Sequence, residues 1–190
     1  MKYRSLLLLI TTLSLFSCTG QKTENRQTES QPDIRQSPIS LQKDKSLISV
    51  RGIVDRYLQI KNALVKDNSS EAATFGGILQ GSLKNFDKTG MTSDQKKTFE
   101  NLAEDAIENA EHISESGKEI EHQREHFEML SKDIYDLVKA FYAGEVLYKE
   151  FCPMYNKGKG AFWLSDSKEI LNPYYGKEML TCGTVLEELN

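Results

Sequence analysis

The sequence predicts an all-α fold, an antiparallel four-helix bundle followed by an irregular, aromatic-rich C-terminal tail. Between residues 47 and 142, apolar side chains recur at helical spacing in four segments with short connections, which favours antiparallel neighbouring helices. After Gly144, glycine, proline and aromatic residues interrupt this pattern. A length of 190 residues with 38% apolar content is sufficient for one domain with additional segments.

The first residues are typical of a secreted protein. Two basic residues precede an apolar run at positions 6–16, which is too short to span a bilayer and suits a signal peptide over residues 1–17. The run ends in Leu15-Phe16-Ser17-Cys18, which resembles a bacterial lipobox and implies that Cys18 carries a lipid and begins the mature chain. Because Thr19 follows instead of aspartate, we expect a cell-envelope protein, anchored by lipid in the outer membrane and facing the periplasm.

The mature chain is expected to have two parts. Residues 18–46 are predicted to be the lipidated cysteine and a disordered tether, because positions 19–46 contain no aromatic residue and many Gln, Ser and Thr. Residues 47–190 are predicted to form the helical domain, with a Cys/Met-rich tail over 145–190.

Local signals mark the ends of the four helices. The first is predicted over about 47–66, and the second ends near residue 87, before Thr89-Gly90. Capping boxes predict the starts of the second, third and fourth helices, and these are Asn68 with Glu71, Thr92 with Gln95 and Ser116 with Glu119. In the tail, residues 146–148 and 184–186 are candidate short strands.

Four sulfur residues lie close together in the tail. Cys152 and Met154 are two positions apart, and Met179 and Cys182 are three apart. Thiol and thioether groups select Cu(I) and similar soft ions. The same residues have a second interpretation, in which the methionines fill the core and the two cysteines form a disulfide. Their spacing leaves both interpretations open.

All three histidines lie within 15 residues of one another. His122 and His126 are four apart on the predicted fourth helix, so they share a face and can chelate a metal. The turn at Gly117 brings His112, near the end of the third helix, close to them. The alternative is an ordinary solvated helix surface, because glutamates surround these positions.

Other function classes lack a recognisable signal. The sequence has no glycine-rich phosphate loop and no serine-centred elbow motif, so we expect no enzyme. A net charge of −4 without a basic run gives no reason to expect nucleic-acid binding.

A series of motifs from the fourth helix to the tail resembles the domain-of-unknown-function family three-three-four-seven. In order, the motifs are HQREHF from His122, LS from Leu130, CPM from Cys152, WLS from Trp163, NPYYG from Asn172 and the segment from Met179 to Gly183. The resemblance covers about residues 48–190. This family occurs in small lipoproteins and fused to CusB-like heavy-metal efflux adaptor proteins.

The resemblance implies a role in heavy-metal handling. Its candidate ligands are Cys152, Met154, Met179, Cys182, His112 and His126. We therefore expect a lipoprotein that binds copper, as Cu(I), or another soft metal without catalysis, in scavenging or in delivery to an efflux adaptor. A non-metal structural or protein-interaction module with a Cys152–Cys182 disulfide is the second hypothesis. A cell-envelope enzyme is a weaker third one.

The lipid anchor gives a direct test. Changing Cys18→Ala removes the sulfur that would carry the acyl chain, so the protein is expected to move from the membrane fraction to the soluble fraction. Fractionation followed by mass spectrometry of the N-terminus measures this. Unchanged membrane partitioning together with an unacylated N-terminus would contradict the lipobox interpretation.

Overall fold

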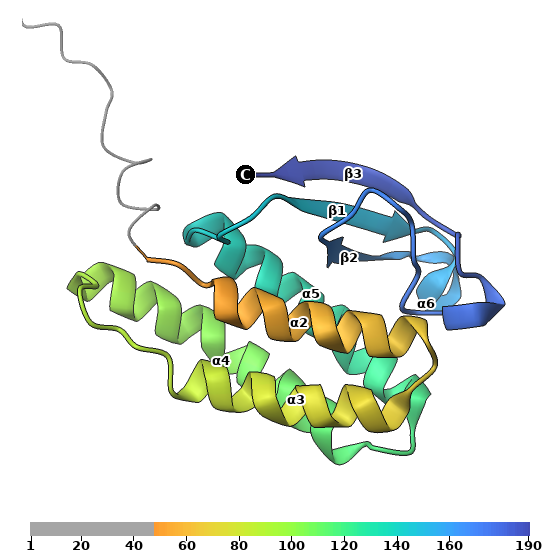
Figure 1. The fold of residues 1–190 in the computed structure, drawn as a ribbon, viewed down its shortest axis with the longest axis horizontal. Helices are drawn as coiled ribbons and strands as arrows, with labels where there is room; N and C mark the ends of the chain where they lie inside the picture. The colour runs from red at the N-terminus through yellow and green to blue at the C-terminus, as the bar shows by residue number, and fades with distance from the viewer. Residues whose placement is uncertain (1–47) are drawn as a thin grey trace, which may run out of the picture. The chain divides into compact units, whose positions relative to one another are not determined.

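The computed structural model describes residues 48–190, which are mostly helical and include a small antiparallel sheet (Figure 1). The four long helices are α2 (Arg51–Val65), α3 (Ser69–Lys84), α4 (Ser93–Glu115) and α5 (Ile120–Ala140). The predicted signal peptide, Cys18 and the predicted tether lie outside the described residues. None of the helices within residues 48–190 is long and apolar enough to cross a membrane.

The helix starts agree with two of the three predicted capping boxes. Thr92 and Gln95 form the complete box at the start of α4, and the Asn68 side chain accepts a hydrogen bond from the Glu71 N–H at the start of α3. The box predicted at Ser116 is wrong, because Ser116 ends α4 by donating its N–H to the His112 carbonyl. The N-cap of α5 is Glu119, which makes no side-chain capping bond.

The outer ends of the first and fourth predicted helices are extended rather than helical. The Val50 N–H donates to the Tyr142 carbonyl (2.9 Å), and the Tyr142 N–H donates to the Ile48 carbonyl (3.1 Å). Ser49 and Tyr142 therefore form a short parallel bridge. These backbone groups pair between the two segments, so α2 begins at Arg51 and α5 ends at Ala140.

The tail was predicted to be irregular apart from two candidate short strands, but it forms a three-stranded antiparallel sheet in the order β2-β1-β3. Its elements are β1 (Leu147–Cys152), α6 (Tyr155–Gly158), β2 (Ala161–Ser165), η1 (Gly176–Glu178) and β3 (Thr184–Leu189). The candidate strands at 146–148 and 184–186 are confirmed as parts of β1 and β3. The turn into β2 requires Gly160, which has φ +77°, because a side chain there would collide with the Phe151 ring.

The sheet covers α2 and α5, whereas α3 and α4 lie on the far side of these helices (Figure 1). The buried Tyr57 hydroxyl of α2 connects the two layers. It accepts a hydrogen bond from the Leu164 N–H of β2 (3.0 Å) and lies 2.8 Å from Ser131 Oγ of α5. Ser131 donates its own proton to the Phe127 carbonyl, so Tyr57 donates to Ser131. This chain fixes the sheet over the helices through satisfied buried groups.

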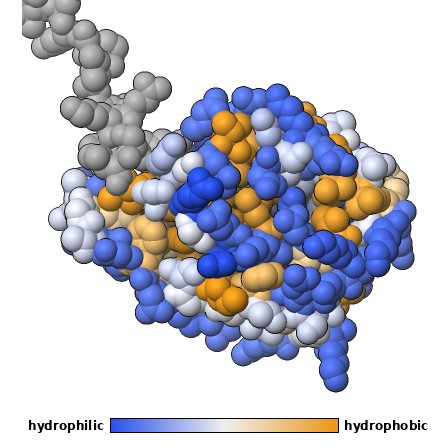
Figure 2. All heavy atoms as spheres, viewed as in Figure 1, coloured by the Kyte–Doolittle hydropathy of each residue, from blue (hydrophilic) through white to orange (hydrophobic). Residues whose placement is uncertain are grey.

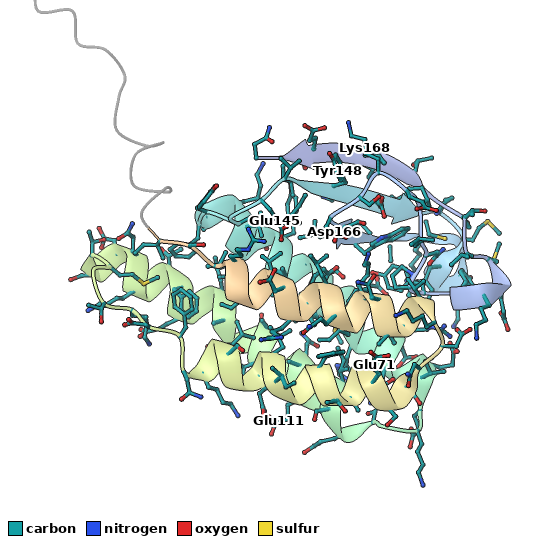
Figure 3. All side chains as sticks on the ribbon, in the orientation of Figure 1. Glu71, Glu111, Glu145, Tyr148, Asp166 and Lys168 are labelled. Carbon is teal, nitrogen blue, oxygen red and sulfur yellow. The ribbon has the colours of Figure 1, made fainter. Side chains whose placement is uncertain are left out.

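A second buried polar group lies between α2 and the sheet. The Lys61 Nζ atom is 3.5 Å from Ser165 Oγ and 3.7 Å from an Asp166 carboxylate oxygen, and Asp166 lies between the sheet and α2 (Figure 3). Glu150 of β1 is fully buried, and neither of its carboxylate oxygens has a hydrogen-bond partner. Burial raises the pKa of Glu150 to about 7, although Lys61 and the nearby Trp163 indole partly oppose the shift.

The surface mixes polar residues with separate apolar patches, as one face shows (Figure 2). Among the described residues, the exposed large hydrophobic side chains include Met129, Met154, Met179, Val185 and Leu186. Met129 is on α5, and the other four lie in the sheet and its connections. The apolar residues therefore do not form one continuous exposed face.

The buried Glu150 predicts a pH dependence of stability. Between its ordinary pKa of 4.5 and about 7, the folded protein holds a proton that the unfolded chain releases, so stability falls as pH rises through this range. The shift corresponds to a loss of about 3 kcal/mol. Urea unfolding at pH 5 and at pH 7.5 measures the free energy of unfolding, and Glu150→Gln should remove this part of its decline. Glu169→Gln, at an exposed position, should retain the full decline. An equal loss of stability between the two pH values in both variants would contradict the assignment to Glu150.

Candidate metal centre

Three histidine side chains converge where α4 ends and α5 begins. One ring nitrogen from each of His112, His122 and His126 lies within 4.8 Å of the others. The rings of His112 and His126 are stacked, with centroids 4.3 Å apart, and the His122 ring stands edge-on to His126 at 4.7 Å. This cluster, called the histidine cluster below, is the only group of three or more His, Cys, Asp or Glu side chains in residues 48–190 with such close donor atoms.

The order of residues along α5 explains this convergence. His122 and His126 are separated by about one helical turn and share a face. Arg124 lies between them and therefore points to the opposite face, where it is buried and contacts the end of α2. The turn from Ser116 to Glu119 reverses the chain, so His112 in the last turn of α4 meets the first turns of α5.

Each histidine has an oxygen acceptor near one ring nitrogen. The Nδ1 atom of His126 is 3.0 Å from Asn109 Oδ1, and Nδ1 of His122 is 3.3 Å from a Glu125 carboxylate oxygen. The Nε2 atom of His112 is 3.9 Å from a Glu108 carboxylate oxygen. Metal-bound histidines usually donate their second ring N–H to such an acceptor, which fixes the ring and leaves the other nitrogen for the ion.

The cluster is electrostatically suited to a cation. Burial, followed by the neighbouring His112 and His122, lowers the pKa of His126. A neutral imidazole is the form that binds a metal, so at neutral pH an ion would not have to displace a proton from the binding nitrogen of His126. The side chains of His112 and His122 are 42% and 44% exposed. An ion could therefore reach the cluster from solvent, and three imidazoles would leave a coordination position open.

A hollow of about 350 Å³ adjoins the histidine cluster along the groove between α4 and α5. It is lined by Asp105, Glu108, Asn109, His126, Met129, Lys132 and Asp133. Asp133 is half-buried there, and its burial raises its pKa to about 6. The hollow therefore gives solvent a path to the His126 side of the cluster.

The sulfur residues lie elsewhere in the fold. Cys152 ends β1 and Cys182 precedes β3, and their Sγ atoms are 3.2 Å apart. This closeness is what the disulfide interpretation requires. Cys152 is fully buried, whereas Met154 and Met179 are 53% and 36% exposed. The hydrogen bond to Cys152 raises the pKa of the Cys182 thiol, which disfavours the thiolate that a metal requires.

The six candidate ligands therefore do not surround one point. His112 and His126 belong to the histidine cluster, which contains neither Cys152 nor Cys182. Met154 and Met179 lie close to the two cysteines in the chain, and both methionine side chains are exposed. The candidate ligands combine sulfur with nitrogen, whereas the structure groups the three histidines with one another and pairs the two cysteines with each other.

His122 was left out of the expected ligand set, although its spacing from His126 was a usable signal. The structure places it with the other two histidines. Asn109 and Asp133 had no sequence signal, because their contacts depend on how α4 and α5 face each other.

Comparison with known proteins gives one match. No curated protein and no solved structure is similar enough to this chain to match it. One family of proteins matches part of the chain, and this match ends at residue 145. It therefore includes the histidine cluster but not the tail, whose motifs contributed most to the resemblance noted in the sequence. Residues 53–145, which span most of α2 and all of α3 to α5, match the family described as "Protein of unknown function (DUF3347)".

Proposed function

We propose that this protein binds a transition-metal ion through His112, His122 and His126. The observation that carries the proposal is the approach of one ring nitrogen from each histidine to within 4.8 Å of the others. Tetrahedral metal–nitrogen bonds of about 2.0 to 2.1 Å place ligand nitrogens about 3.4 Å apart, so side-chain rotations that close a gap of up to about 1.5 Å would complete the site. The oxygen acceptors beside the rings and the lowered pKa of His126 support the same use.

The ligand type favours copper or zinc. Imidazole suits both ions, and at a given set of nitrogen ligands Cu(II) binds more tightly than Zn(II). A preference for Cu(I) would require sulfur ligands, and that part of the proposal rests on Cys152, Met154, Met179 and Cys182. Because His112 and His122 are open to solvent, the site suits reversible binding better than a permanent structural ion.

The proposed setting is the cell envelope. With Cys18 lipidated, the domain would be held at the outer membrane and face the periplasm, where it would scavenge the metal or deliver it to a heavy-metal efflux adaptor without catalysing a reaction. The expectation that the four helices form an antiparallel bundle also stays a proposal. It is supported by the packing of each helix against its neighbours in the chain.

A second candidate function is a structural or interaction module stabilised by a disulfide. The 3.2 Å separation of the Cys152 and Cys182 sulfurs favours it, as does the oxidising compartment that a secreted chain would enter. The two candidates are compatible, because the cysteines and the histidine cluster involve different elements.

The metal proposal is tested by titrating Cu(II) and Zn(II) into the full-length protein purified in detergent. Each of His112→Ala, His122→Ala and His126→Ala should weaken binding by about 100-fold or more, since loss of a hydrogen-bond partner of a ligand alone costs about 10- to 100-fold. Glu111→Ala, next to His112 but exposed, is the matched control and should bind like the wild type. Equal affinity in the triple histidine variant would overturn the proposal.

The disulfide is tested by counting thiols in protein isolated from the envelope. We expect no free thiol at Cys152 or Cys182, and the bridge should stabilise the fold by about 3 to 4 kcal/mol for a loop of this length. The double variant Met154→Leu with Met179→Leu should leave Cu(I) binding unchanged if the methionines only pack. Two free thiols, with Cu(I) affinity that falls in the methionine variant, would instead indicate a soft-metal site.

A further inference from the structure

A chain of hydrogen bonds connects His126 of the histidine cluster to the carboxylate of Asp133, about two turns further along α5. Asn109 of α4 lies at its centre. Its amide nitrogen is 3.0 Å from Asp133 Oδ2 on α5 and 3.0 Å from the Asp105 carbonyl. Its amide oxygen is 3.0 Å from Nδ1 of His126. Asn109 is only 8% exposed, so water cannot easily replace these partners.

The partners determine which way the Asn109 amide faces. A carbonyl oxygen and an ionised carboxylate can only accept hydrogen bonds, so both N–H groups of Asn109 must face Asp105 and Asp133. The amide oxygen then faces His126. Since an amide oxygen only accepts, the hydrogen between Asn109 and His126 belongs to the His126 ring, on Nδ1.

This arrangement has a consequence for metal binding. A neutral imidazole carries one proton, so a proton on Nδ1 leaves the lone pair on Nε2. A histidine in water has no neighbour that selects Nδ1–H, whereas His126 has one that is held in place by two further hydrogen bonds.

We infer that Asn109 and Asp133 are positioning residues that hold His126 as its Nδ1–H tautomer and present Nε2 to the metal ion, an inference that rests on the proposed function. Asn109 acts directly on the ring. Asp133 acts through Asn109, because it accepts the N–H that would otherwise leave the amide free to turn. His126 and Asp133 are seven residues apart on α5 and so share the face toward α4, which allows one asparagine to contact both.

The experiment measures the tautomer without a metal. The chain has three histidines, so nitrogen NMR of the ¹⁵N-labelled, metal-free full-length protein in detergent resolves them, with single His→Ala variants for assignment. In the wild type, His126 should show a protonated Nδ1 and an unprotonated Nε2. Asn109→Leu should shift the proton toward Nε2 and lower Cu(II) and Zn(II) affinity by about 10- to 100-fold.

Two further variants separate positioning from folding. Asp133→Leu should weaken the Nδ1–H preference less than Asn109→Leu. The exchanged pair, Asn109→Asp with Asp133→Asn, keeps an acceptor for His126 and a donor between the helices but leaves a carboxylate oxygen facing the Asp105 carbonyl. It should therefore restore the tautomer and only part of the affinity. Asn101→Leu, an exposed asparagine two turns earlier on α4, is the matched control and should change neither.

The outcomes distinguish this inference from the proposed function. A proton on Nε2 of His126 in the wild type, or an unchanged tautomer in a folded Asn109→Leu variant, would overturn the inference. Protein that shows the expected tautomer but binds neither Cu(II) nor Zn(II) would overturn the proposed function and leave the tautomer assignment supported.

Discussion

The buried guanidinium of Arg124 determines how α5 sits in the fold. Its nitrogens donate hydrogen bonds to the carbonyls of Pro173 and Leu64 and to the carboxylates of Asp67 and Glu121. A buried charge with fixed partners is costly to move, because its hydration would have to be restored elsewhere. With Arg124 held toward α2 and the segment before η1, the opposite face of α5 must present His122 and His126 to α4. The histidine cluster therefore depends on an ion pair that contacts none of its members.

Local signals in the sequence are sufficient for the helices but not for their ends. Thr92 and Gln95 mark the start of α4 correctly because both capping partners lie within one turn. Ser116 fits the same pattern and fails, since its N–H is already used to close α4. Residues 48–50 look helical in the sequence, yet their backbone pairs with the chain around Tyr142, some ninety positions away. A pattern within a few residues cannot predict a pairing with so distant a segment.

The candidate site could be predicted only in part for the same reason. The spacing of His122 and His126 is a local property, and it places both on one face. The approach of Cys152 to Cys182 depends on the pairing of β1 with β3. The edge strand β2, which pairs with the other side of β1, gave no recognisable pattern in its five residues. The roles inferred for Asn109 and Asp133 depend on the packing of two helices, so residue types alone could not suggest them.

The two groups of candidate ligands differ in how an ion could reach them. Cys152 is fully buried at the end of β1, and its contact with Cys182 raises the pKa of the Cys182 thiol. His112 and His122 are open to solvent, and the third member, His126, is buried enough to stay neutral. Under the proposed function, this difference assigns exchangeable metal binding to the histidine cluster. The cysteine pair then serves to join the end of β1 to the segment that leads into β3.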